Sequence, residues 1–233
     1  MKVLVLLPVL VASGICASSA PTASDAIVEN YCAATKRQAE IVTDASMEVD
    51  ISGSIPKLKK QGKLHALRRI TALGRITYEA LRFQGDDTVK RNVIAKYLQA
   101  EQQSQQDPSL AVTPENYNFN YKGRTQLDGR ETHLFDVSPK KKRQGLYRGQ
   151  LWLDADSFLR VQESGRLVKN PSFVLRKVEF VRKYEIRDGL SVPVQLQSVA
   201  DTWLVGKTEL TVDYTNFSVD PKRAGSLSDG EDR

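Results

Sequence analysis

Residues that could support catalysis are few in this chain, and they are not spaced as a catalytic site. Its two histidines, His65 and His133, fall in different predicted strands. The sequence contains no HExxH, CxxC or GxSxG motif, so the common zinc, dithiol and serine-nucleophile signatures are missing. Cys32 lies inside a predicted helix, where we expect a packed, inert thiol rather than a nucleophile.

Two acidic pairs are the other candidates for chemistry. Asp86 and Asp87 follow one predicted strand, and Asp154 and Asp156 follow another. Aspartate is common at such positions because it caps helices and forms turns. A site for a hard cation needs more oxygen ligands than either pair supplies. The sequence therefore predicts no catalytic residue, no metal site and no cofactor.

The strongest run of charge is basic and consists of Lys140, Lys141, Lys142 and Arg143. It follows Pro139 and lies at the tip of a predicted hairpin. A solvated loop that prevents association of sheet edges would explain it. The functional alternative is docking to anionic lipid head groups. No aromatic platform is interleaved with these charges, so binding of nucleic acid is not predicted.

Residues 1–20 have the layout of a secretory signal peptide. Lys2 gives a short basic start, the stretch 3–11 is mostly Val and Leu, and small residues follow as far as Ala20. The apolar run is shorter than the ~20 residues that span a bilayer. We expect cleavage and release into the periplasm. The residues before Cys16 fit a lipoprotein signal poorly, which argues against lipid anchoring there.

The remaining pattern predicts one domain over residues 21–219 and a disordered, charged tail over residues 220–233. The full chain has a formal charge of +6, which favours contact with anionic surfaces but does not bear on the fold. Helical spacing of apolar residues predicts amphipathic helices at 25–42 and about 89–101, with a polar linker at 102–108. Alternating apolar and polar residues predict strands at 47–51, 63–71, 75–83, 117–126, 131–138, 146–154, 158–168, 172–187, 190–200 and 207–219.

Alternation of this kind leaves each strand with one apolar face that another layer has to cover. We therefore expect a mainly β protein with two or more helices, in which a curved antiparallel half-barrel sheet has helices over its concave face. An incompletely filled concave face would form an apolar pocket. The candidate ligand contacts, which ordinary core packing would also explain, are Leu151, Leu153, Val178, Phe180, Leu196, Val212 and Tyr214.

Several stretches together resemble the outer-membrane lipoprotein-sorting proteins, the LolA/LolB-like periplasmic lipoprotein carriers. The most specific is Gly149-Gln150-Leu151-Trp152-Leu153-Asp154, followed by residues 161–165; the stretches 170–173, 178–181 and 189–193 extend it. The resemblance covers residues 25–219 and is greatest to uncharacterised bacterial members. It implies an open half-barrel whose cavity shelters lipoprotein acyl chains. These motifs are structural, so no functional residue is transferred from the family.

The leading hypothesis is an exported periplasmic carrier or chaperone that binds a lipid or lipidated protein in an apolar cavity, without catalysis. The alternative is an envelope sensor or scaffold that binds a protein partner through the same fold, for example at an exposed sheet edge. A hydrolase of envelope polymers would need clustered carboxylates or a metal. The expected partners are lipid or lipoprotein acyl chains, with transient contact to an anionic membrane, and we expect a monomer.

Overall fold

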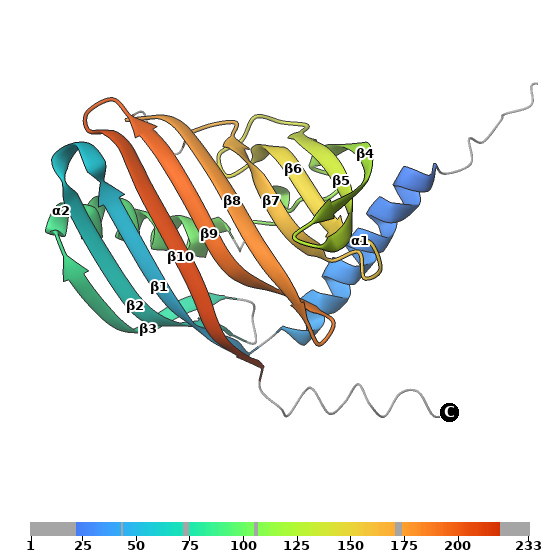
Figure 1. The fold of residues 1–233 in the computed structure, drawn as a ribbon, viewed down its shortest axis with the longest axis horizontal. Helices are drawn as coiled ribbons and strands as arrows, with labels where there is room; N and C mark the ends of the chain where they lie inside the picture. The colour runs from blue at the N-terminus through green and yellow to red at the C-terminus, as the bar shows by residue number, and fades with distance from the viewer. Residues whose placement is uncertain (1–21, 43, 72–74, 105–106, 171–173, 220–233) are drawn as a thin grey trace, which may run out of the picture.

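The computed structural model describes residues 22–42, 44–71, 75–104, 107–170 and 174–219. The predicted signal peptide, Cys16 and the predicted tail lie outside these ranges. In the part described, one open, curved antiparallel sheet dominates the molecule, and helical segments lie beside it (Figure 1). Among the described residues, no helix is long and apolar enough to cross a membrane.

The sheet has ten strands in the order β3-β2-β1-β10-β9-β8-β7-β6-β5-β4, so the last strand pairs with the first and β3 and β4 are the edges. Each strand predicted from the sequence corresponds to one of these strands, and the antiparallel, mainly β fold is confirmed. The bounds are β1 (Ala45–Ile55), β2 (Lys60–Ile70), β3 (Ile76–Gly85), β4 (Tyr117–Leu127), β5 (Arg130–Pro139), β6 (Tyr147–Asp154), β7 (Arg160–Leu167), β8 (Leu175–Arg187), β9 (Leu190–Thr202) and β10 (Gly206–Val219).

The first helix, α1 (Ala23–Ile41), begins at a capping box. The Thr22 backbone N–H donates to the Asp25 carboxylate at 2.9 Å, and the Asp25 N–H donates to the Thr22 hydroxyl. Tyr31 on its inner face is 2% exposed. Near the other end, the Gln38 side chain bonds both the N–H and the C=O of Ser191, which ties α1 to β9.

A second helical segment packs on β1 and β2 and consists of α2 (Asp87–Val89), the π-helical turn η2 (Lys90–Ile94) and α3 (Ala95–Ser104). Two glycines allow its close approach: a Cβ at Gly53 would lie 2.9 Å from Val89 Cγ1, and one at Gly62 would lie 3.2 Å from it. The helix extends past Glu101 into the predicted linker, because residues 102–104 are polar but compatible with a helix. That helices cover the concave face stays a prediction.

Buried side chains form two clusters. The α3 cluster contains Met47, Val49, Ile51, Leu64, Ala66, Ile94, Leu196, Leu210, Val212 and Tyr214. The α1 cluster contains Val28, Tyr31, Tyr117, Phe135, Val137, Leu146, Tyr147, Leu151 and Leu153. Phe180 packs against both clusters and joins them. Two short 3-10 turns, η1 (Pro56–Leu58) and η3 (Pro108–Leu110), complete the described elements.

Candidate functional site

A row of directly paired residues crosses the inner face of the sheet and contains two charges among apolar side chains. Paired residues of antiparallel strands point to the same face. The two charges, Glu163 on β7 and Arg182 on β8, therefore share a face with core leucines. From β6 to β2 the row consists of Leu151, Glu163, Arg182, Leu196, Val212, Ile51 and Leu64.

The Glu163 carboxylate is held by two arginines. Arg160 Nη1 lies 2.7 Å from Glu163 Oε1, and Arg182 Nη1 lies 3.9 Å from Oε2. The Glu163 side chain is 3% exposed, whereas those of Arg160 and Arg182 are 26% and 36% exposed. The Arg160 guanidinium also lies 5.5 Å from the centre of the Tyr184 ring. A carboxylate without these cations would be strongly disfavoured at this depth.

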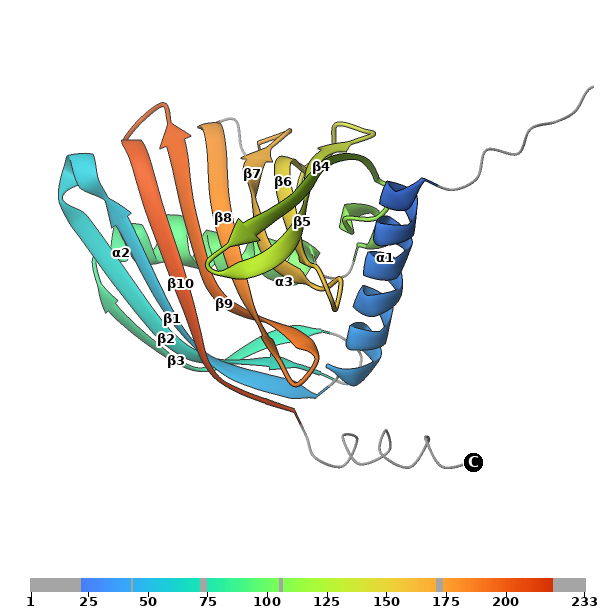
Figure 2. The ribbon, with the colours of Figure 1, turned by 45° about the vertical axis from the view of Figure 1, so that its right-hand side comes forward.

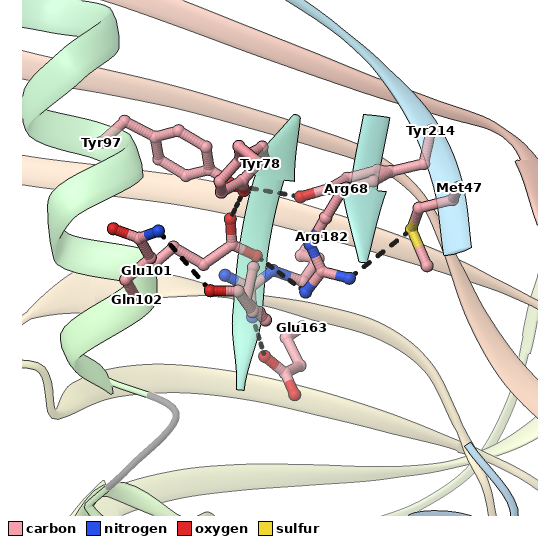
Figure 3. A network of polar contacts seen from close by, with 10 residues as sticks. Met47, Arg68, Tyr78, Tyr97, Glu101, Gln102, Glu163, Arg182 and Tyr214 are labelled. Carbon is pink, nitrogen blue, oxygen red and sulfur yellow. Dashed lines mark hydrogen bonds and ion pairs between the residues drawn. The ribbon is translucent and has the colours of Figure 1, made fainter. Parts of the chain in front are cut away.

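A second ion pair links the sheet to α3 (Figure 3). Arg68 Nη2 lies 3.1 Å from Glu101 Oε1, and the Tyr78 hydroxyl donates to Glu101 Oε2. Arg68 Nη1 faces Met47 Sδ at 3.7 Å, which is a weak acceptor. The Arg68 side chain is 5% exposed, and its Nε has no hydrogen-bond partner in the described part of the chain.

The tyrosines around these ion pairs are neutral. Burial raises the pKa of Tyr214 to about 12, and burial also raises the pKa of Tyr78 and Tyr97. The hydroxyls of Tyr97 and Tyr214 lie 2.9 Å apart and bond each other. The charged groups are therefore three arginines and two glutamates, and 3 − 2 leaves one formal positive charge.

Next to these groups is a cavity of about 220 Å³, which lies between the C-terminal end of α1 and α3. Arg68, Arg160, Arg182 and Glu101 line its charged side. Its apolar wall is formed by Val42, Met47, Ile70 and Phe217. The cavity can hold a ligand that combines an anionic group with an apolar part. It differs from the purely apolar pocket that the sequence predicted.

A second hollow, of about 430 Å³, lies against β4, β5 and β6. It is a more open depression than the cavity, and Asn118, Asn120, Arg148 and Gln150 are among its lining residues. Asp136, which also lines it, pairs with Lys122 at 3.6 Å. These groups are exposed or partly exposed, so the hollow has no buried charge comparable to that of the arginine-lined cavity.

The predicted ligand residues are either buried or partly exposed. Phe180 and Val178 on β8 are partly exposed. Tyr214 lines the cavity. Ligand contact at the seven positions stays a prediction. The buried members are Leu151, Leu153, Leu196, Val212 and Tyr214.

The basic run lies on the exposed connection between β5 and β6, as predicted for a hairpin tip. The Lys140 amino group donates to the Pro114 carbonyl. Lys141, Lys142 and Arg143 are exposed. Docking through this run stays a prediction.

The other candidates for chemistry are in structural roles. Asp86 caps α2 and pairs with Lys60 at 3.2 Å, and Asp154 accepts hydrogen bonds from Ser157 and Arg130. Asp50 bonds His65, and the Tyr121 hydroxyl bonds His133. Burial raises the pKa of Cys32. Within the described ranges, no group of three or more His, Cys, Asp or Glu could hold a metal ion.

Sequence reasoning missed the four charged residues that line the cavity and Glu163, which pairs with two of them. Arg68 continues the alternation of Leu64 and Ala66, so its place on the inner face could have been read from the spacing. Glu163 likewise shares its alternating set with Val161. The pairing of Arg68 with α3 had no local signal, because it joins residues 33 positions apart in the chain.

Neither the profiles of known protein families nor the curated protein sequences match this chain. Among solved structures, a DUF1329 family protein from Desulfovibrio piger is 15% identical, with a TM-score of 0.43, over 83% of this chain and 93% of its own. A LolA superfamily protein from Nitrosomonas europaea is 12% identical, with a TM-score of 0.38, over 86% and 94%.

A third solved structure, described as an outer membrane lipoprotein-sorting protein domain from Vibrio parahaemolyticus, is 11% identical, with a TM-score of 0.41, over 83% of this chain and 92% of its own. The structures similar to this chain thus include the group that its sequence resembles. The likeness concerns the fold. Because the TM-scores are below 0.5, this likeness does not support a function. The functional argument therefore rests on the cavity.

Proposed function

We propose that the protein is an exported, non-catalytic carrier in the periplasm that binds an amphiphile, either a lipid or the acylated end of a lipoprotein. The anionic group of the ligand lies against Arg68, Arg160 and Arg182, and the start of its chain lies on the apolar wall. The observation that supports this function is the net positive charge of a sheltered cavity that is apolar on one side.

The charge of the cavity favours an anion over a neutral head. Two carboxylates serve three guanidinium groups, and Arg68 Nε is a buried donor without a partner. Guanidinium groups bind carboxylate and phosphate in a bidentate manner, which is their strongest form of hydrogen bonding. A carboxylate or phosphate would neutralise the cavity and supply the missing acceptor.

The size of the cavity determines how much of the ligand it can enclose. At about 220 Å³ it is smaller than the pockets of roughly 300–1,000 Å³ that enclose whole small molecules. It therefore receives the head and the first methylenes, and the rest of the chain extends beyond it. Each methylene that reaches an apolar wall adds about 0.8 kcal/mol to binding.

A second candidate function is binding of a protein segment at the edge strand β3. The side chains of Leu81 and Phe83 are 46% and 42% exposed. Ala80, with φ +52°, lies in a bulge beside them. An added strand could pair with this edge and bury both side chains. This function requires no ligand in the cavity.

Two measurements separate these functions. Organic extraction of the natively purified mature protein, followed by mass spectrometry, should yield a stoichiometric lipid if the protein is a carrier. Calorimetric titration should then give at least ten-fold tighter binding of palmitate than of hexadecanol, which has the same chain without the charge. An empty extract together with no uptake of palmitate would support the edge-strand function instead.

Variants locate the anion within the protein. Arg182→Gln should abolish the preference for palmitate over hexadecanol, because it removes the most exposed cation of the cavity. Arg148→Gln, on the second hollow, is the matched control and should leave that preference unchanged. Equal binding of palmitate and hexadecanol by the unaltered protein would exclude the proposed role of the arginines.

A further inference from the structure

The two most exposed large apolar side chains of the described residues lie at one end of the sheet, and a third exposed one lies beside them. Trp203 and Leu204, at the β9–β10 connection, are 68% and 75% exposed, and Leu58 in η1 is 43% exposed. The β1–β2 and β9–β10 connections are neighbours, since a Cβ at Gly206 would lie 3.8 Å from Lys57 Cδ. Figure 1 shows both at the same end of the sheet. This apolar tip is not needed to fill the core.

Basic side chains surround the apolar tip. Lys57, Lys59 and Lys207 are exposed and have no ion-pair partner among the described residues. The Arg176 guanidinium lies 4.4 Å from the centre of the Trp203 ring and supports the indole from one side. Two acidic residues are nearby, Asp201 and Glu209, and the latter accepts a hydrogen bond from Ser54. Four cations against two anions leave 4 − 2 = +2.

The strand order places the basic run on the same rim. Because neighbouring strands are antiparallel, the β1–β2, β5–β6 and β9–β10 connections all lie at one rim of the sheet. Figure 2 shows the β1–β2 and β9–β10 connections on its upper side. The β5–β6 connection adds the basic run, residues 140–143. We call this end the basic rim.

The opposite rim carries acidic and basic residues in balance. It consists of the β2–β3, β4–β5, β6–β7 and β8–β9 connections, where Asp128, Asp156 and Asp188 are accompanied by Arg75, Arg130 and Arg187. The large exposed apolar side chains Trp203 and Leu204 lie at the basic end. These exposed apolar side chains and the lysines without an ion-pair partner among the described residues, Lys57, Lys59 and Lys207, therefore occur together on the basic rim.

We propose that the basic rim docks on the surface of an anionic lipid bilayer. Trp203 and Leu204 enter the interfacial region, where tryptophan is preferred, and the lysines remain at the level of the head groups. Anionic head groups attract basic residues next to such an apolar tip. As the surface on which the carrier would act, the bilayer rests on the proposed function. Docking itself can be measured without a ligand in the cavity.

Vesicle co-sedimentation of the full mature chain tests this docking. We expect binding to vesicles that contain phosphatidylglycerol and at least ten-fold weaker binding to vesicles of phosphatidylcholine alone. The double variant Trp203→Ser, Leu204→Ser and the triple variant Lys57→Gln, Lys59→Gln, Lys207→Gln should each bind at least ten-fold more weakly. Arg187→Gln, on the opposite rim, is the control and should bind like the unaltered protein.

The outcomes distinguish docking from the cavity function. If the rim variants lose vesicle binding and still bind palmitate, the basic rim is the docking surface. No vesicle binding by the unaltered protein, or unchanged binding by both rim variants, would overturn the proposal even if palmitate binds. Thermal unfolding of each variant, expected to match that of the unaltered protein, verifies that these exposed substitutions leave the fold intact.

Discussion

Glu163 and Arg182 lie directly opposite each other on β7 and β8, in the middle of a row whose other members are apolar. Arg160, three positions before Glu163, reaches the same carboxylate from the start of β7. The register of two strands, rather than a loop, therefore sets the position of both guanidinium groups. A site built on strands holds its groups more precisely than a site built on loops.

Glu163→Gln should lower the free energy of unfolding by about 1–3 kcal/mol, since it removes the counter-charge of two arginines that keep partial access to water. The same change raises the formal charge of the five charged groups in and beside the cavity from +1 to +2, so palmitate should bind more tightly. Urea denaturation and calorimetric titration measure the two effects. Glu185→Gln, in an exposed pair with Arg187, is the control and should change neither.

Gly53→Ala should destabilise the protein by about 1–3 kcal/mol, because the added methyl would lie 2.9 Å from Val89 Cγ1. Val89→Ala shortens the side chain that it would meet. In the double variant, the two changes should therefore be less harmful than the sum of the single changes. A double-mutant cycle by urea denaturation measures this coupling, and strict additivity would show that the two residues do not touch.

Glu101→Gln should loosen α3, because it weakens the ion pair with Arg68. We expect amide hydrogen exchange in residues 95–104 to become about ten-fold faster or more, since ~1.4 kcal/mol corresponds to a factor of ten. Exchange in α1 should not change, as α1 is held separately through Gln38 and Ser191. Uniform acceleration across both helices would contradict a local role for Glu101.

His133 should make the protein less stable in mild acid. Burial, with Arg124 nearby, lowers the pKa of His133 below its ordinary value of about 6.5. The folded state therefore favours the neutral ring. Its contribution is complete above the unfolded-state pKa and is lost as the pH falls through the folded-state pKa. The melting temperature should thus decrease from about pH 7 to about pH 5 more in the unaltered protein than in His133→Gln.

The exposed histidine is the control for this experiment. His65→Gln should retain the full decrease in melting temperature, because His65 lies at the outer surface next to Asp50. If the unaltered protein and His133→Gln had parallel melting curves over this pH range, burial of the ring would not contribute to the pH dependence.

The sequence predicted the strands well because almost every strand has one solvent-exposed face, so that polar and apolar residues alternate along it. The alternation of Leu210, Val212 and Tyr214 identified β10, and the alternation of Met47 and Val49 identified β1. The exceptions are at element ends. β8 begins at Leu175, whereas the predicted strand began at residue 172, and α3 ends at Ser104, whereas the predicted helix ended at about residue 101. End positions depend on caps and packing that periodicity does not record.

The candidate site was harder to predict because charged residues on a strand normally indicate its solvent-exposed face. On β8, every second residue faces the same way, so Arg182 shares its face with Phe180, which was predicted to point inward, and with Tyr184. The charge of Arg182 nevertheless suggested the solvent-exposed face. Its partner Glu163 comes from another strand. The π-helical turn at residues 90–94 also had no local signal. Tertiary pairing decides such features.

The pairing of β1 with β10 brings Ala45 next to Val219, across nearly the whole domain. Until the final strand is available, β1, β2 and β3 have no neighbour through which to join the other strands. Contacts this distant in sequence give a high contact order, and we expect folding on a timescale of roughly milliseconds to seconds. Completion of the sheet therefore waits until β10 has been synthesised, however early the other strands pair.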